Sequence, residues 1–179
     1  MPGLERLDEH DVSTVNHETL LSHLDAAYNL ARWLMGNGAD AEDVVQDAYV
    51  RALAGADRFR GGDERAWLLS IVRNGCYSTH RRQRVRQAAD FDETVHGKDT
   101  VTPSPEQRAI DRDTSRRVRL AVERLTPEFR EVVVLREFED LSYKEIADVV
   151  GAPIGTVMSR LSRARAQLQA ALAEDGGRA

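Results

Sequence analysis

Apolar residues recur every three or four positions along three segments of the N-terminal half, and this spacing predicts three amphipathic helices. The first covers residues 20–35 and ends at Gly36, which begins a stop signal. Asp40 can cap the second helix, over residues 40–53. After a polar loop, the third helix runs from about residue 64 to residue 82.

These helices have distinct polar faces. The second helix turns Val44 and Ala48 inward, and its outer surface carries Asp43, Gln46 and Asp47. The third helix turns Leu69, Val72 and Cys76 inward. Its other side carries Trp67, Ser70, Asn74, Tyr77 and Arg81. The spacing also fits a Trp67 side chain that is partly in the core.

The helical pattern disappears over residues 87–107, where acidic residues and Thr102-Pro-Ser-Pro105 indicate a flexible, extended linker. A second helical block begins near Pro105 and breaks at Thr126-Pro127. No stretch alternates with period two long enough to predict a strand. The sequence therefore predicts an all-α protein with two small helical domains, over residues 17–86 and 108–174.

Residues 141–168 carry the most specific local signals. Ser142 and Glu145 form a capping box that opens a helix, and Gly151 ends this helix where a left-handed residue is needed. Pro153 suits the first turn of the next helix, whose apolar stripe is Val157, Leu161, Ala164 and Leu168. The polar and basic outer face of this second helix favours a helix-turn-helix over an ordinary helical hairpin.

The net charge and its distribution along the chain indicate the kinds of partner that the protein binds. The chain has a formal net charge of -5, which by itself disfavours a nucleic-acid partner. However, residues 1–60 hold 11 Asp and Glu against 5 Lys and Arg, whereas residues 71–87 hold 5 arginines and no acid. Such segregated acidic and basic surfaces predict two kinds of partner.

Location and chemistry can be predicted from what the sequence lacks. No apolar run approaches the roughly 18 residues of a membrane span, the N-terminus does not resemble a secretory signal, and Cys76 is a single cysteine. We therefore expect a cytoplasmic protein without membrane insertion. The histidines lack metal-ligand spacing, and no glycine-rich phosphate loop follows a strand. The sequence predicts no catalytic residues, no cofactor and no metal.

Three segments, in order, resemble the sigma factors of bacterial RNA polymerase, in particular the extracytoplasmic-function group. Leu125-Thr-Pro-Glu-Phe-Arg, continued through Gly155-Thr-Val-Met-Ser-Arg160, is similar to region four of this family. Asp40-Ala-Glu-Asp-Val-Val-Gln-Asp47 resembles its polymerase-clamp-binding helix. Phe59-Arg60, Arg65-Ala-Trp-Leu68 and Arg73-Asn74 resemble its promoter-opening segment. The combination is far more specific than a helix-turn-helix alone.

The resemblance implies a protein that binds core RNA polymerase, directs it to promoters and is controlled by an anti-sigma factor. Its polymerase contacts would be the clamp helices of the largest subunit, bound by Asp43, Gln46 and Asp47, and the flap of the second-largest subunit. Opened promoter DNA would bind Phe59, Arg60, Trp67, Arg73, Asn74, Tyr77, Arg81 and Arg82. Duplex promoter DNA would bind Thr156, Met158, Ser159, Arg160, Ser162 and Arg163.

Three positions depart from the family pattern. Gly75 inside the third helix costs about 1 kcal/mol relative to alanine. Ser78 stands where the family often has an acid, and Met158 stands where it often has a base. Readout of duplex DNA would therefore depend more on Ser159, Ser162 and Arg163.

Two other functions are compatible with parts of the sequence. A sigma-like mimic would occupy an anti-sigma factor without directing transcription, and it would need neither the arginines after Tyr77 nor a basic recognition helix. A conventional helix-turn-helix repressor or activator binds duplex DNA alone, which leaves residues 40–82 unexplained. The sequence favours a working sigma factor over both.

Overall fold

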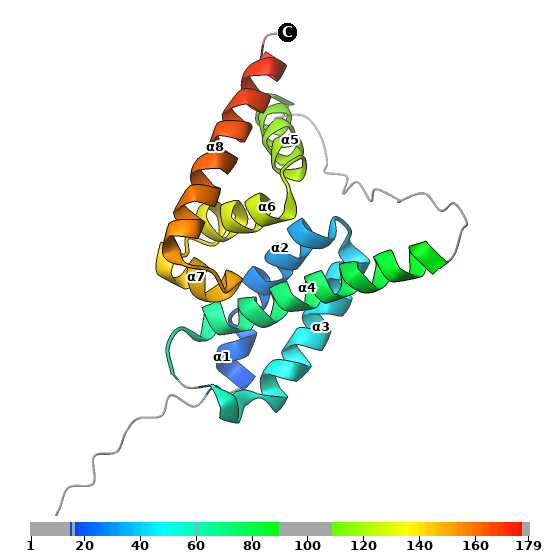
Figure 1. Ribbon diagram of the computed structural model, residues 1–179, viewed down its shortest axis with the longest axis vertical. Helices are drawn as coiled ribbons and strands as arrows, with labels where there is room; N and C mark the ends of the chain where they lie inside the picture. The colour runs from blue at the N-terminus through cyan, green and yellow to red at the C-terminus, as the bar shows by residue number, and fades with distance from the viewer. Residues whose placement is uncertain (1–14, 16, 60, 90–108, 177–179) are drawn as a thin grey trace, which may run out of the picture.

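The computed structural model describes residues 15, 17–59, 61–89 and 109–176, and every regular element in these ranges is a helix. The all-α class predicted from the sequence is confirmed. The helices of the N-terminal half, coloured blue to green, lie below those of the C-terminal half in Figure 1. Among the described residues, no helix combines the length and apolar character that crossing a membrane requires.

The N-terminal half consists of α1 (His17–Leu21), α2 (Leu24–Met35), α3 (Gly38–Ala54), a short 3-10 turn (Ala56–Arg58) and α4 (Glu64–Ala89). The helix expected over residues 20–35 is divided between α1 and α2. The Ser22 hydroxyl donates to the Thr19 carbonyl over 2.7 Å, and such a local bond competes with continuation of the helix.

The turn between α2 and α3 confirms one prediction and corrects another. Gly36 ends α2 in the left-handed region, with φ of 80°, as its position in the sequence predicts. Asp40, however, is not the cap of α3. The cap is Asn37, whose side chain accepts a 2.8 Å hydrogen bond from the backbone N–H of Asp40. The helix therefore begins earlier than expected, at Gly38.

Helix α4 is seven residues longer than predicted, because it continues from residue 82 to Ala89. Its last turns contain only Gln, Arg, Val and Ala, which are compatible with a helix. These turns project from the body of the molecule, so they need no apolar stripe (Figure 1). Residues 87–89 of the predicted linker are thus helical, and the rest of it lies outside the described residues.

The C-terminal half consists of α5 (Ala109–Glu123), α6 (Pro127–Val133), a π-helical turn η2 (Val134–Phe138), α7 (Tyr143–Val150) and α8 (Ile154–Gly176). The predicted break at Thr126-Pro127 is confirmed, with Pro127 in the first turn of α6. The residues near Pro105, where this block was expected to begin, are outside the described residues. The π-helical turn was not predicted.

The helices and turn of the predicted helix-turn-helix are confirmed. The capping box of Ser142 and Glu145 opens α7, and Gly151 ends it with φ of 65°. Pro153 lies just before α8 rather than within its first turn. The inward stripe of α8 is buried at Val157, Leu161 and Ala164 and half-buried at Leu168.

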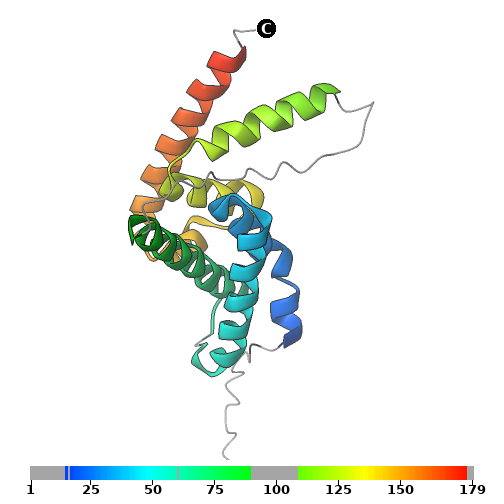
Figure 2. The same ribbon diagram turned by 90° about the vertical axis from the view of Figure 1, so that its right-hand side faces the viewer.

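The two halves of the described structure pack against each other. Helix α4 contacts α7, and α2 contacts α6. The buried apolar residues of both halves form one continuous cluster. Figures 1 and 2 show α4 running along the boundary between the halves. This boundary brings side chains predicted to bind DNA close to the C-terminal helices.

Candidate polymerase and nucleic-acid interfaces

The predicted polymerase-binding ridge lies on the solvent side of α3. Asp43, Gln46 and Asp47 are exposed, whereas the opposite face of the helix buries Ala41, Val44, Ala48 and Ala52. Asp47 approaches Arg51 at 3.8 Å, but both side chains remain largely exposed, so this pair is weak. The ridge is therefore an accessible acidic surface on a rigid helix.

The residues predicted for promoter opening fall into two groups. Asn74, Arg81 and Arg82 on α4 are exposed. Trp67, Arg73 and Tyr77 are half-buried, Phe59 is only 8% exposed, and Arg60 is outside the described residues.

Phe59 and Trp67 form an aromatic pair. Their ring centroids lie 5.4 Å apart at a tilt of 55°, and both rings pack on the core of the N-terminal half. This agrees with the alternative that Trp67 is partly a core residue. The Phe59 ring therefore packs against the Trp67 ring and is largely shielded from solvent.

Arg73 and Tyr77 contact a carboxylate of the other half. Glu131 on α6 is fully buried, and it accepts hydrogen bonds from Arg73 Nε over 2.7 Å and from the Tyr77 hydroxyl over 3.0 Å. The Arg73 guanidinium also lies 4.6 Å from the centroid of the Tyr77 ring. Arg160 on α8 reaches the same carboxylate at 3.4 Å. Glu131 thus joins three predicted DNA-binding side chains.

This environment perturbs the titration of both α4 side chains. Burial works to lower the pKa of Arg73, but the hydrogen bond and charge of Glu131 raise that pKa above its usual value. Burial is the main cause that raises the pKa of Tyr77, and the Glu131 carboxylate raises it further. Near neutral pH, Tyr77 is therefore a hydrogen-bond donor and Arg73 a permanent cation.

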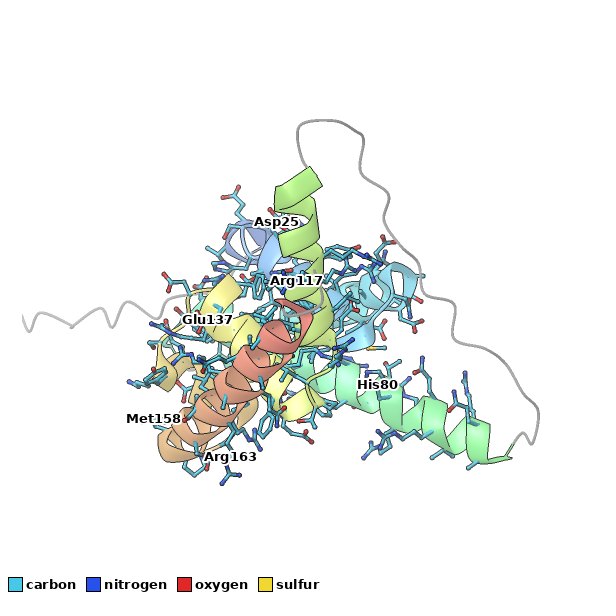
Figure 3. All side chains as sticks on the ribbon, turned by 90° about the horizontal axis from the view of Figure 1, so that it is seen from above. Asp25, His80, Arg117, Glu137, Met158 and Arg163 are labelled. Atoms are coloured by element: carbon cyan, nitrogen blue, oxygen red, sulfur yellow. The ribbon has the colours of Figure 1, made fainter. Side chains whose placement is uncertain are left out.

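The recognition helix α8 presents most of its predicted DNA-binding residues to solvent. Met158 is 52% exposed, and Ser159, Ser162 and Arg163 are also exposed. Figure 3 shows Met158 and Arg163 on the outer side of α8. Thr156 is half-buried, and its carbonyl accepts a 2.9 Å hydrogen bond from the Ser159 hydroxyl. Arg160 differs, because its pairing with Glu131 turns it inward.

A second buried carboxylate was missed by the sequence analysis. Glu139, at the C-terminal end of η2, is 7% exposed and forms an ion pair with Arg65 on α4. Asn29 on α2 donates its side-chain N–H to the same carboxylate. The only sequence signal for these two acids was that Glu131 directly precedes the apolar run Val132–Leu135 and shares its helical face.

The thiol of Cys76 has the environment of a structural residue. Cys76 is fully buried in α4, and burial raises its pKa to about 12. The thiol is therefore protonated and inaccessible at neutral pH. Within the described ranges, no group of three or more His, Cys, Asp and Glu side chains is arranged to hold a metal ion.

Each half of the chain matches a known protein-family model. Residues 20–86 match the family model of Sigma-70 region 2, and residues 115–168 match Sigma-70, region 4. The α3 ridge and most of α4 lie in the first match, and the helix-turn-helix lies in the second.

Curated relatives have the same organisation. The chain is 38% identical over 161 residues to the ECF RNA polymerase sigma factor SigE of Mycolicibacterium smegmatis, covering 88% of this chain but 61% of that protein. It is 36% identical over 144 residues to the ECF RNA polymerase sigma factor EcfG of Rhodopseudomonas palustris, covering 80% of this chain and 77% of that protein.

A solved structure agrees with these relatives. The sigma factor RpoE of Bartonella quintana, determined in complex with the anti-sigma factor NepR, has a TM-score of 0.66 and 33% identity, covering 87% of this chain and 94% of that one. The matches extend over both helical halves. The chain therefore belongs to the sigma-70 family, in its extracytoplasmic-function (ECF) group.

Proposed function

We propose that this protein is a working sigma factor, which binds core RNA polymerase, recognises promoters and initiates transcription without performing chemistry itself. The observation that carries the proposal is that two accessible surfaces of opposite character lie on separate rigid helices. One is the acidic ridge of α3, and the other is the polar and basic face of α8. A protein that bound only DNA would not need the first surface.

The acidic ridge is assigned to the polymerase. Asp43, Gln46 and Asp47 offer carboxylates and an amide in a row on one face, suited to a basic helix such as the clamp helices of the largest subunit. The C-terminal half is assigned to the flap of the second-largest subunit by the family resemblance. These two attachments would hold the DNA-binding faces of α4 and α8 along one promoter.

The DNA-binding residues are assigned to two forms of DNA. Exposed Ser159, Ser162 and Arg163 suit the base edges of duplex DNA in the major groove. Opened strands are assigned to Arg60, Trp67, Arg73, Asn74, Tyr77, Arg81 and Arg82, which combine rings, an amide and phosphate-binding cations. Phe59 belongs to this set through its packing against the Trp67 ring. Thr156, Met158 and Arg160 complete the proposed duplex-binding set. The Arg160 guanidinium is paired with Glu131 in this structure, so it would have to leave that carboxylate to contact DNA.

Control by an anti-sigma factor is part of the proposal. Solved relatives include RpoE with the anti-sigma factor NepR and CnrH with the cytosolic domain of CnrY, the latter at 29% identity and a TM-score of 0.64. A chain with the same fold offers comparable surfaces for such a partner.

Run-off transcription with core polymerase tests the proposed function. Core enzyme should produce discrete transcripts from some members of a promoter panel only when this protein is added. A sigma-like mimic would produce no transcripts yet still bind an anti-sigma factor. A conventional regulator would bind duplex promoter DNA without core enzyme and would not co-purify with it.

A further inference from the structure

Two adjacent rows of exposed residues run along the solvent side of α8. In an α-helix, residues four positions apart lie one above the other on the same face. The two rows consist of Ile154, Met158 and Ser162, and of Gly155, Ser159 and Arg163. The second row is polar after its glycine. The first row begins with two apolar side chains, and the proposed function does not say which chemical group they bind.

Ile154 and Met158 are large apolar side chains left in solvent. Ile154 is 45% exposed and Met158 is 52% exposed. Neither belongs to the apolar cluster that the described residues form, because Val157 and Leu161 pack α8 on the core instead. Single exposed apolar residues are common on protein surfaces. A pair of them at the base-reading end of a recognition helix indicates an apolar group on the DNA.

Gly155 lies between these two residues in the sequence, in the first turn of α8. Glycine is unfavourable in a helix relative to alanine. The described structure gives no internal reason for it, because an added Cβ atom would meet nothing within 4 Å beyond the backbone of its own helix and the adjacent residues. A glycine with open space outside it allows another molecule to approach the helix backbone closely.

Duplex DNA presents an apolar group in its major groove, the 5-methyl group of thymine. A recognition helix places its N-terminal residues against the base edges of that groove, and in α8 these residues include Ile154, Gly155 and Met158. Residues 151–172 contain three arginines and no acid, so the helix carries no charge that would repel the phosphates on either side. The apolar end of the first row can therefore lie against thymine.

We propose that the N-terminal end of α8 recognises thymine in the upstream promoter element. Ile154 and Met158 contact 5-methyl groups, and Gly155 lets the helix approach the bases closely enough for this contact. The inference rests on the proposed function, because it takes α8 as the helix that enters the major groove. Methionine is flexible and polarisable, so its side chain adapts to a methyl group. A basic residue at position 158 would suit a phosphate, which carries no sequence information, whereas Met158 makes the contact depend on the base.

The test uses the full chain bound to core polymerase and a promoter that is active in the run-off panel. Each thymine of the upstream element, on both strands, is replaced in turn by deoxyuridine. This base keeps the O4 acceptor and the pairing with adenine and lacks only the methyl group. Competition against the unmodified promoter should show binding about fourfold weaker for at least one replacement, as expected for one buried methyl group. Binding that is unchanged by every replacement would overturn the proposal.

Substitutions of the apolar pair identify the side chains responsible. Ile154→Ala and Met158→Ala should each abolish the deoxyuridine penalty at one thymine or more. Met158→Lys should bind the promoter more tightly than Met158→Ala through its added charge, yet be equally insensitive to the methyl group. The control is Leu21→Ala, which removes a side chain of similar exposure, 43%, from α1 and should keep every penalty. Penalties that all persist in either alanine variant at positions 154 and 158 would overturn the proposal.

Gly155→Ala separates stability from recognition. Alanine should raise the Tm by about 1 to 3 °C, because it favours the helix and its Cβ atom meets open space. The same methyl group should weaken promoter binding about fivefold or more, comparable to one mismatched base pair. The control is Gly38→Ala in the first turn of α3, where the added Cβ lies 3.6 Å from the Tyr28 hydroxyl oxygen and should leave promoter binding unchanged. Promoter binding by Gly155→Ala that equals wild-type binding would contradict the close approach.

Failure of the proposed function has a different signature. If core polymerase with this protein produces no transcript from any promoter, the sigma-factor assignment is wrong, and the recognition of thymine by α8 fails with it. If transcription starts at discrete promoters but no deoxyuridine replacement affects binding, the assignment stands and only the recognition of thymine is overturned.

Discussion

Gly75 lies in the middle of α4, where this helix crosses α3. A glycine at such a position is unfavourable for the helix by about 1 kcal/mol relative to alanine. A Cβ atom placed there would lie 3.0 Å from Cγ1 of Val44, which is buried in α3. The glycine therefore permits close packing of the two helices, which the sequence could not show because it requires knowledge of the partner.

Gly75→Ala should destabilise the protein in spite of the better helix propensity of alanine. Valine in a helix strongly prefers one χ1 rotamer, so Val44 cannot move aside without strain. We expect a loss of about 1 kcal/mol in the free energy of unfolding, in the range typical of overpacking. In a urea-denaturation double-mutant cycle, Val44→Ala should make Gly75→Ala less costly. Additive effects of the two substitutions would contradict this account.

The capping box of α7 gives a pH-dependent prediction. Hydrogen bonds from Ser142 are the main cause that lowers the pKa of Glu145. A carboxylate whose pKa is lower in the folded state stabilises the fold above its unfolded pKa of about 4.3, and loses this effect as the pH falls through the folded pKa. Ser142→Ala should therefore cost about 1 kcal/mol at neutral pH, and less in acid.

Thermal unfolding between neutral and acidic pH measures this difference. Ser162→Ala, at an exposed position of α8, is the matched control and should show a small effect that does not vary with pH. A cost of Ser142→Ala that stays constant, or grows, toward low pH would exclude the role assigned to Glu145. This capping box was readable in the sequence because both members lie within one turn.

At the scale of single elements, helix α3 separates a buried face from an acidic one. Reversing the charge of Asp43 and Asp47 to lysine should weaken co-purification with core polymerase while leaving helix content unchanged, because both side chains are exposed. Asp25 on α2 and Asp148 on α7 are also exposed, and their reversal makes the same change in net charge. If both double variants lose core binding equally, general electrostatics and not the ridge is responsible.

Helix α8 gives a prediction about duplex recognition. Arg163→Ala should relax the preference among upstream promoter sequences, since a bidentate contact to guanine is worth about 1 to 3 kcal/mol of discrimination. Arg163→Lys keeps the charge but loses the planar fork, so it should bind duplex DNA more tightly than the alanine variant without restoring preference. Competition binding with core enzyme present measures both. Restored preference in the lysine variant would indicate a phosphate contact instead.

Substitutions on α4 should impair a different step of initiation from substitutions on α8. An alanine triple variant at Trp67, Asn74 and Tyr77 should spare binding to closed promoters but reduce strand separation, detected by permanganate footprinting. A premelted bubble template should restore part of its transcription, because opening no longer depends on base capture. Equal rescue of this variant and of Arg163→Ala, or rescue of neither, would refute the division between the two helices.

Elements were predictable where amphipathic periodicity marks them. The stripes of α3 and α8 identified those helices and their exposed faces, and Gly36 and Gly151 marked two ends. The last turns of α4 were missed because they carry no apolar stripe, and residues 84–88 are exposed. The π-helical turn was missed because its apolar residues have ordinary helical spacing. Only its backbone hydrogen bonding distinguishes it from an α-helix, as in the 3.1 Å bond from the Glu139 N–H to the Val134 carbonyl five residues earlier.

At the scale of the whole molecule, the contacts between the halves could not be predicted from the sequence. Glu131 and Glu139 resemble ordinary surface acids until α4 is placed against them. Arg73 and Tyr77 were recognised as candidate DNA contacts from their residue types and the family resemblance. Their shared partner Glu131 lies 58 and 54 residues away along the chain, and no local pattern encodes such a pairing.

The shared core predicts cooperative unfolding. In scanning calorimetry the wild type should unfold in one transition, with a ratio of calorimetric to van't Hoff enthalpy of about 1. Glu139→Gln should raise this ratio or resolve two transitions, because the halves then unfold more independently. Glu137→Gln, which removes a carboxylate paired with Arg165 of the same half, should retain a single transition. Two transitions already in the wild type would show that the interface is too weak to couple the halves.

The placement of the chain's two tryptophans has an optical consequence. Trp33 lies against Phe138 at the boundary between the halves, whereas Trp67 packs on Phe59 inside the N-terminal half. Separation of the halves would expose the first indole to water and leave the second unchanged. In a Trp67→Phe background, the intrinsic fluorescence emission would then come from Trp33 alone. A red shift of this emission on adding core polymerase would therefore report separation of the halves, without any attached dye.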